Sequence, residues 1–161
     1  AARKMPPSPT YDPLEAGTSP APAPTPAPAP SQPSAALPGP WTGEYFAGRE
    51  LTGDPALVRT DPAIDFDWSW DAPAEELPVD DFAVRWTGTF DLEGGTYRLK
   101  TVSDDGIRVY VDDRLLISSW RPMRGTRYAT VALDAGAHTV RVEYFEARQA
   151  AKAQFTWTKV R

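Results

Sequence analysis

The sequence contains no cysteine and only one histidine. The lack of cysteine excludes disulfides, thiolate metal sites and cysteine nucleophiles, although it leaves an extracellular location open. The sequence also lacks any apolar run near the roughly 20 residues that a bilayer-spanning helix needs, so we do not expect this chain to cross a membrane. Its first residues include no methionine start and lead into no signal segment, and we expect a fragment or processed form of a longer protein.

The sequence also lacks a face rich in lysine and arginine. Its formal net charge is -5, and the basic and acidic residues of the first 40 positions balance, so the excess of acid lies in the remainder. An acidic domain without a cluster of lysine and arginine is poorly suited to nucleic acid or to anionic membranes. We therefore expect no nucleic-acid partner, and a cation or a neutral polar ligand suits the chain better.

Residues 1–40 contain most of the 18 prolines. Proline and alanine alternate almost without a break from Pro20 to Pro30, and such a run forms neither a helix nor a sheet ladder. We expect this run to be an extended polyproline II segment of roughly 35 to 40 Å, acting as a linker or stalk. Alternatively, residues 1–40 are a tether that docks on a partner protein or on a neighbouring copy of the chain.

From residue 41 onward the pattern changes to short strands separated by glycine, proline and aspartate. The segment Asp81 to Phe90 alternates, with Phe82, Val84 and Trp86 on one face and Ala83 among the polar residues on the other. The sequence further predicts a tight hairpin at Asp112-Asp113, and a loop from Glu146 to Ala151 before the last strand. Turn signals every 8 to 12 residues predict an all-β fold, an antiparallel β-sandwich or barrel, over residues 41–161.

Two adjacent carboxylates stand out at Ser103-Asp104-Asp105-Gly106. Neighbouring side chains of an extended strand point to opposite faces, so Asp104 and Asp105 can hold one ion only if the backbone between them is unusual, for example cis. An ordinary Asp-Gly turn between two paired strands is the simpler interpretation, and spacing alone favours it. A calcium ion held by both carboxylates is the alternative.

The order of several motifs then resembles a known family. These are Trp41-Thr-Gly-Glu-Tyr-Phe46, Leu51-Thr-Gly-Asp54, Ile64-Asp-Phe-Asp-Trp68, Phe82-Ala-Val-Arg-Trp-Thr-Gly88, Gly95-Thr-Tyr-Arg-Leu99, Ser103-Asp-Asp-Gly-Ile-Arg-Val109, Ala135-Gly-Ala-His138 and Val142-Glu-Tyr-Phe-Glu146. They resemble a PA14 domain over residues 41–161. The resemblance implies a β-sandwich module of extracellular proteins. It also implies, from the adhesin branch of the family, a calcium ion held by two aspartates joined through a cis peptide and bound in turn by vicinal sugar hydroxyls.

The residues that match this calcium site are Asp104 and Asp105. Calcium takes about six to eight oxygen ligands, and the family draws further ones from the loop before the last strand, often through an asparagine. This chain contains no asparagine. Gln149 is the only amide in that loop and is our candidate third ligand, with an ordinary solvated loop residue as the alternative. Family members often carry glycines where this chain has Gln149-Ala150-Ala151-Lys152.

The other candidate residues carry weaker signals. Trp120 lies on a loop that could approach the aspartate pair, so it is a candidate sugar contact, with a packing role as the alternative. His138 has no second histidine or cysteine to form a metal site, and we expect a structural role. Adjacent acids on a turn do not provide the cleft between two carboxyls that a glycosidase needs, and we expect no catalytic residues.

These observations predict a non-catalytic carbohydrate-binding or adhesion module that uses calcium and lies outside the cell, at the cell surface or on the periplasmic side. Its partner would be a glycan or cell-surface carbohydrate. The alternative is a structural or assembly module of a larger extracellular or membrane-attached complex, with the proline-rich segment docked on a protein partner and no sugar bound.

Overall fold

The computed structural model describes residues 40–161, so the predicted linker or tether at residues 1–40 lies almost entirely outside the described residues. The described part consists of ten strands: β1 (Trp41–Ala47), β2 (Leu57–Asp61), β3 (Asp65–Ser69), β4 (Phe82–Leu92), β5 (Gly95–Asp104), β6 (Gly106–Val111), β7 (Arg114–Ser119), β8 (Gly125–Leu133), β9 (Gly136–Glu146) and β10 (Ala151–Lys159). In residues 40–161 there is no helix long and apolar enough to cross a membrane.

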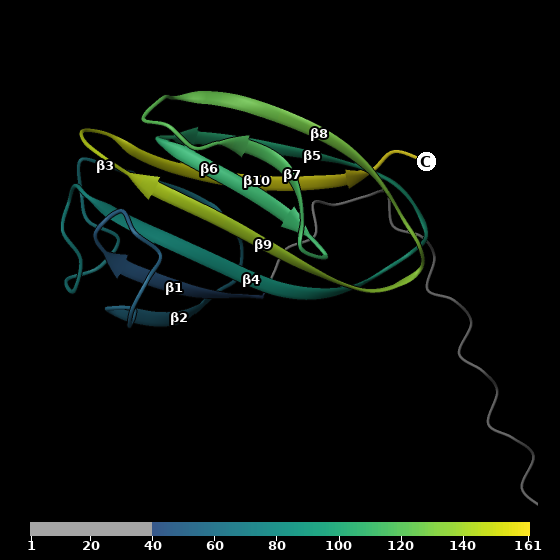
Figure 1. Cartoon of the computed structure of the whole chain (residues 1–161), viewed down its shortest axis with the longest axis horizontal. Helices are drawn as coiled ribbons and strands as arrows, with labels where there is room; N and C mark the ends of the chain where they lie inside the picture. The colour runs from purple at the N-terminus through teal and green to yellow at the C-terminus, as the bar shows by residue number, and fades with distance from the viewer. Residues whose placement is uncertain (1–39) are drawn as a thin grey trace, which may run out of the picture. The chain divides into compact units, whose positions relative to one another are not determined.

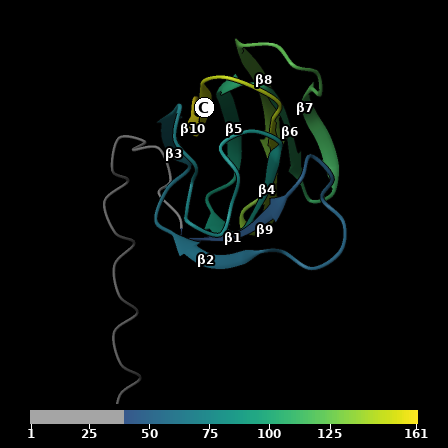
Figure 2. The same cartoon turned by 90° about the vertical axis from the view of Figure 1, so that its left-hand side faces the viewer.

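The strands form two stacked antiparallel sheets, as Figure 1 shows. One sheet has six strands in the order β2-β1-β4-β9-β6-β7, and the other has four in the order β3-β10-β5-β8. Figure 2 views the two layers from the end at which β5 and β9 finish. The predicted all-β antiparallel sandwich is therefore confirmed.

Alternating side chains fill the space between the sheets. On β4, Phe82, Val84 and Trp86 are fully buried, as the alternation predicts. Trp86 stacks with Phe66 of β3, with ring centroids 5.7 Å apart and planes 10° apart. A core of this size, rich in large aromatic rings, stabilises a domain without disulfides because each buried ring removes a large apolar area from water.

The environment of Ala83, on the outer face of the six-stranded sheet, differs from the one that the sequence predicts. We expected Ala83 among solvent-facing residues, but it is fully buried in a small second cluster with Phe46, Phe145 and Ala147. Leu51, from the β1–β2 loop, and Trp120, from the β7–β8 loop, pack against this cluster. Long loops thus fold back over the sheet at the end where β9 finishes.

Two turns join their flanking strands in different ways. The predicted Asp112-Asp113 hairpin is confirmed, because β6 pairs with β7 and both aspartates adopt positive φ. The turn at Gly94-Gly95 instead carries the chain from one sheet to the other, since β4 and β5 belong to different sheets.

Candidate functional site

The two adjacent aspartates lie where the chain crosses from one sheet to the other. Asp104 ends β5 in the four-stranded sheet, and Gly106 begins β6 in the six-stranded sheet. The interpretation as a turn between paired strands is therefore wrong, because β5 and β6 are not hydrogen-bonded neighbours. The peptide bond between Asp104 and Asp105 is cis. This is the unusual backbone that the two-carboxylate interpretation requires.

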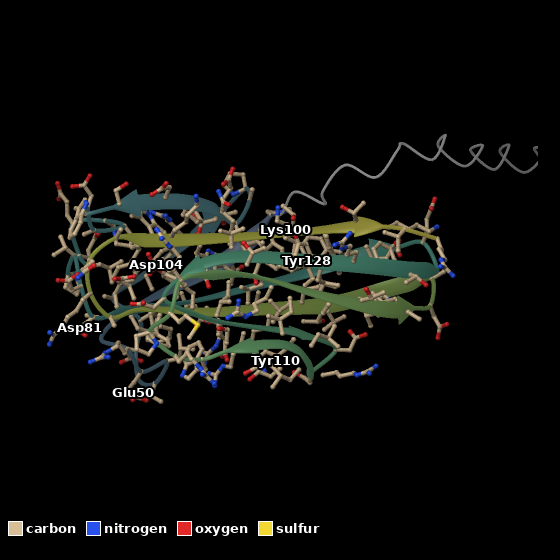
Figure 3. All side chains as sticks on the ribbon, turned by 90° about the horizontal axis from the view of Figure 1, so that it is seen from above. Glu50, Asp81, Lys100, Asp104, Tyr110 and Tyr128 are labelled. Atoms are coloured by element: carbon tan, nitrogen blue, oxygen red, sulfur yellow. The ribbon has the colours of Figure 1, made fainter. Side chains whose placement is uncertain are left out.

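A third carboxylate joins the pair from the other sheet. Glu146 is the last residue of β9, and Figure 1 shows that β5 and β9 end on the same side of the sandwich. One carboxylate oxygen from each of Asp104, Asp105 and Glu146 lies within 4.8 Å of the other two. Figure 3 shows Asp104 towards the end that also carries Asp81 and Glu50. We call these three carboxylates, Asp104, Asp105 and Glu146, the acidic cluster.

Hydrogen bonds fix the backbone around the acidic cluster. The hydroxyl of Ser103 donates to the carbonyl oxygen of Asp105 over 2.9 Å. The backbone amide of Ala147 donates to Oδ2 of Asp105 over 2.8 Å. The Tyr144 hydroxyl lies within hydrogen-bond distance of both the Asp104 carbonyl oxygen and Oε2 of Glu146. The cluster is thus held by β5, β9 and the loop that follows β9.

Glu146 is the least satisfied acid of the core. Its side chain is fully buried, and within residues 40–161 its Oε1 has no hydrogen-bond partner. The buried carboxylate of Asp61 offers a contrast, because it accepts hydrogen bonds from Tyr45, Trp86 and Arg59. A buried charged oxygen without a partner is strongly unfavourable. Glu146 therefore needs either a proton or a cation.

The electrostatics of the acidic cluster point the same way. Burial, followed by the negative charge of Asp105, raises the pKa of Glu146 to about 8. Burial and the neighbouring Asp105 also raise the pKa of Asp104, and the positive charge of Arg124 opposes that shift. Both raised pKa values mean that negative charge is unfavourable at the acidic cluster unless a positive group is added.

A pocket of about 430 Å³ opens onto the aspartate pair. Its lining residues are Arg49, Asp104, Asp105, Pro122, Arg124, Ala147, Arg148 and Gln149. The structure thus brings the predicted ligand Gln149 to the same pocket as Asp104 and Asp105. Gln149 has a φ of 81°, and its backbone amide donates to Oδ1 of Asp80 over 3.0 Å. This hydrogen bond anchors the loop. Gln149 adopts the left-handed conformation at a position where family members often carry glycine.

Trp120, the predicted sugar contact, lies beside the pocket in a packed position. Its ring meets the Phe145 ring edge-on at 4.8 Å, and the guanidinium of Arg108 lies 3.7 Å from its centroid. The residues of its loop that line the pocket are Pro122 and Arg124. A direct contact between Trp120 and a ligand stays a prediction.

His138 occupies the opposite end of the sandwich. Its Nδ1 lies 2.6 Å from Oδ2 of Asp112, and its Nε2 lies 2.7 Å from the carbonyl oxygen of Asp134. These contacts tie the β6–β7 hairpin to the β8–β9 turn. This geometry agrees with the structural role expected from the sequence.

Sequence reasoning missed Glu146 as a member of the site, although a signal for it was present. Val140, Val142 and Tyr144 alternate along β9 and are buried, and the same period of two places Glu146 in that row. We had assigned Glu146 to the following loop, so its burial was not anticipated. An acid that continues an inward-facing row is a buried charge, and buried charges usually have a partner.

The fold and site define a β-sandwich domain with an oxygen-rich acidic cluster at one end. The chain belongs to the PA14 domain family, whose model matches residues 37–161. It is 36% identical over 119 residues to the anti-sigma-I factor RsgI3 of Acetivibrio thermocellus. The aligned residues make up 72% of this chain and 18% of that protein.

Solved structures show the same fold. An anti-sigma factor domain-containing protein from Clostridium clariflavum superposes with a TM-score of 0.71 at 30% identity, over 76% of this chain and 42% of the other. A structure described as the PA14 sugar-binding domain from an RTX adhesin superposes with a TM-score of 0.63 at 19% identity, over 77% of this chain and 91% of the other. This chain thus spans less than half of the anti-sigma factor proteins that it matches.

The donor set of the acidic cluster fits a hard cation. Calcium binds carboxylate and carbonyl oxygens. The cluster offers three carboxylates, and one of their oxygens has no hydrogen-bond partner among residues 40–161. It contains no nitrogen or sulfur ligand of the kind that zinc or copper prefers. The residues present could therefore hold calcium, and Gln149 lies near enough to the pair to line the same pocket.

Proposed function

We propose that this domain is a non-catalytic carbohydrate-binding module that uses a calcium ion held by Asp104, Asp105 and Glu146. The observation that carries the proposal is the fully buried Glu146, which lies beside two further carboxylates and whose Oε1 has no hydrogen-bond partner in the described part of the chain. When bound, calcium supplies positive charge and open coordination positions for hydroxyl oxygens. The pocket beside Asp104 and Asp105 gives a sugar access to those positions, and Gln149 provides a polar group at its rim.

The burial of the cluster argues against glycosidase chemistry. A glycosidase needs two carboxyl groups that flank an accessible glycosidic bond. Here Glu146 is fully buried and Asp105 is only 6% exposed, so no sugar ring can enter between them. The acids suit the task of holding a cation better than that of transferring a proton to a substrate.

The relatives support a role at the cell exterior within a longer protein. One is named as a sugar-binding domain of an adhesin, and others are named as anti-sigma factors. We infer that sugar binding by this domain serves either attachment or the detection of an extracellular carbohydrate. A docking function of residues 1–40 on a protein partner is the second candidate. Loss of that partner on deletion of these residues, with sugar binding unchanged, would support it.

Calcium and glycan binding test the proposal together. Titration calorimetry with calcium, followed by a glycan array in calcium and in chelator, should show sugar binding that requires the ion. Asp105→Ala should abolish both. The proposal fails if the array is negative, or if wild type and Asp105→Ala bind the same glycans equally well.

A further inference from the structure

The rim of the pocket carries positive charge, although the chain as a whole is acidic. Three of its eight lining residues are arginines, namely Arg49, Arg124 and Arg148. They come from the β1–β2, β7–β8 and β9–β10 loops, respectively. Three segments far apart in the sequence thus bring guanidinium groups to the opening in which Asp104 and Asp105 lie.

Two of these arginines are available to a ligand. The guanidinium of Arg49 pairs with Asp81 over 2.9 Å, which occupies its charge. Within residues 40–161, neither Arg124 nor Arg148 forms an ion pair or a side-chain hydrogen bond, and both are exposed. A guanidinium presents its donors in a planar fork that matches a carboxylate or sulfate group.

We propose that the pocket takes an anionic sugar, whose acidic group pairs with Arg124 and Arg148 while its hydroxyl oxygens face the acidic cluster. The inference rests on the proposed function, because three carboxylates without a cation would repel such a ligand. Calcium at the cluster offsets two of its three negative charges, so Arg124 and Arg148 then give the lining of the pocket a net positive charge.

The local arrangement outweighs the net charge of the chain. Charges farther apart than about 8–10 Å are largely screened at physiological ionic strength, so the groups that line the pocket decide what it attracts. The volume of about 430 Å³ lies within the range of roughly 300–1,000 Å³ that is usual for small-molecule sites. The proposed ligand thus differs from our expectation of a cation or a neutral polar ligand, which was drawn from the overall charge of -5.

Matched sugars test the inference directly. Calorimetry in the presence of calcium would compare D-galacturonate and D-glucuronate with their methyl esters, which lack the negative charge and carry one added methyl group. We expect each acid to bind at least about tenfold more tightly than its ester, the effect of a charge-assisted pair. Galactose 6-sulfate distinguishes the source of the charge: tight binding of both acid types indicates recognition of any anion, and tight binding of the uronates alone indicates recognition of the carboxylate.

Variants of the rim test the role of the arginines. Arg124→Gln and Arg148→Gln should each remove most of the preference for the acid. Arg121→Gln removes the same charge from the same loop as Arg124 but from a residue that does not line the pocket, and should keep the preference. The inference is overturned if acid and ester bind equally, if none of these sugars binds, or if Arg121→Gln loses as much preference as Arg148→Gln. Equal, calcium-dependent binding of acid and ester would leave the proposed function standing.

Discussion

The backbone amide of Ala147 donates a hydrogen bond to Oδ2 of Asp105 over 2.8 Å. This contact joins the crossover between the sheets to the first residue of the loop after β9. Both groups are buried, so neither finds water if the other is removed. The carboxylate of Asp105 therefore has two separable roles, one in holding the loop and one in the acidic cluster.

Two substitutions of Asp105 separate these roles. In chelator, Asp105→Ala should lower the free energy of unfolding by about 1–3 kcal/mol, because the Ala147 amide is left buried without an acceptor. Asp105→Asn keeps an acceptor oxygen and should cost less in chelator, yet still lose calcium binding. Urea unfolding of both variants checks this, and equal losses of stability would contradict the role of the hydrogen bond.

Glu146→Gln tests the third carboxylate. The amide has nearly the same shape without the buried negative charge, so in chelator at pH 8 we expect the variant to be at least as stable as the wild type. Its calcium affinity should fall at least about tenfold, as for loss of a metal-site group. Glu93→Gln, at the opposite end of the sandwich, is the matched control. A variant of Glu146 with wild-type calcium affinity would remove this residue from the ligand set.

Gly106 follows the aspartate pair because the Phe145 ring fills the space where a side chain would begin. A Cβ at this position would lie 2.0 Å from that ring. Gly106→Ala should therefore destabilise the domain by about 1–3 kcal/mol through overpacking. Combining it with Phe145→Leu should recover part of the loss, since the two residues are in contact. Simply additive losses in urea unfolding would show that the contact is not the cause.

The sequence predicts much of this arrangement from local patterns, and what it misses is long-range. Asp104 and Asp105 are recognisable from a motif, and the buried row of β4 from its alternation. The crossover at Asp105-Gly106 cannot be predicted in this way, because an Asp-Gly pair is equally suited to a hairpin. The strand with which β5 pairs is decided by residues far away in the sequence. The burial of Ala83 depends likewise on loops that return from residues 51 and 120.

The contact between His138 and Asp112 predicts a pH dependence of stability. The hydrogen bond to Asp112 raises the pKa of His138 and lowers the pKa of Asp112. The contribution of His138 is complete below its unfolded pKa of about 6.5 and is lost as the pH rises through the higher folded pKa. That of Asp112 is present above about pH 4 and is lost as the pH falls through its lower folded pKa.

The pair should therefore stabilise the domain most between about pH 4 and pH 6.5. Thermal melts of the wild type and of His138→Gln from pH 4 to pH 9 check this. We expect the difference in Tm to be largest near pH 5–6 and to shrink above pH 7. A difference that does not vary with pH would exclude a charged pair.

The central claim, that the acidic cluster holds calcium, is tested most directly by thermal melts of the domain with calcium and with chelator. A ligand at 100 times its Kd adds about 2.7 kcal/mol to the free energy of unfolding, which for a domain of this size raises Tm by about 10 °C. We predict that rise with calcium, a much smaller one with magnesium, and none for Asp105→Asn. An unchanged Tm of the wild-type domain at millimolar calcium would contradict the account.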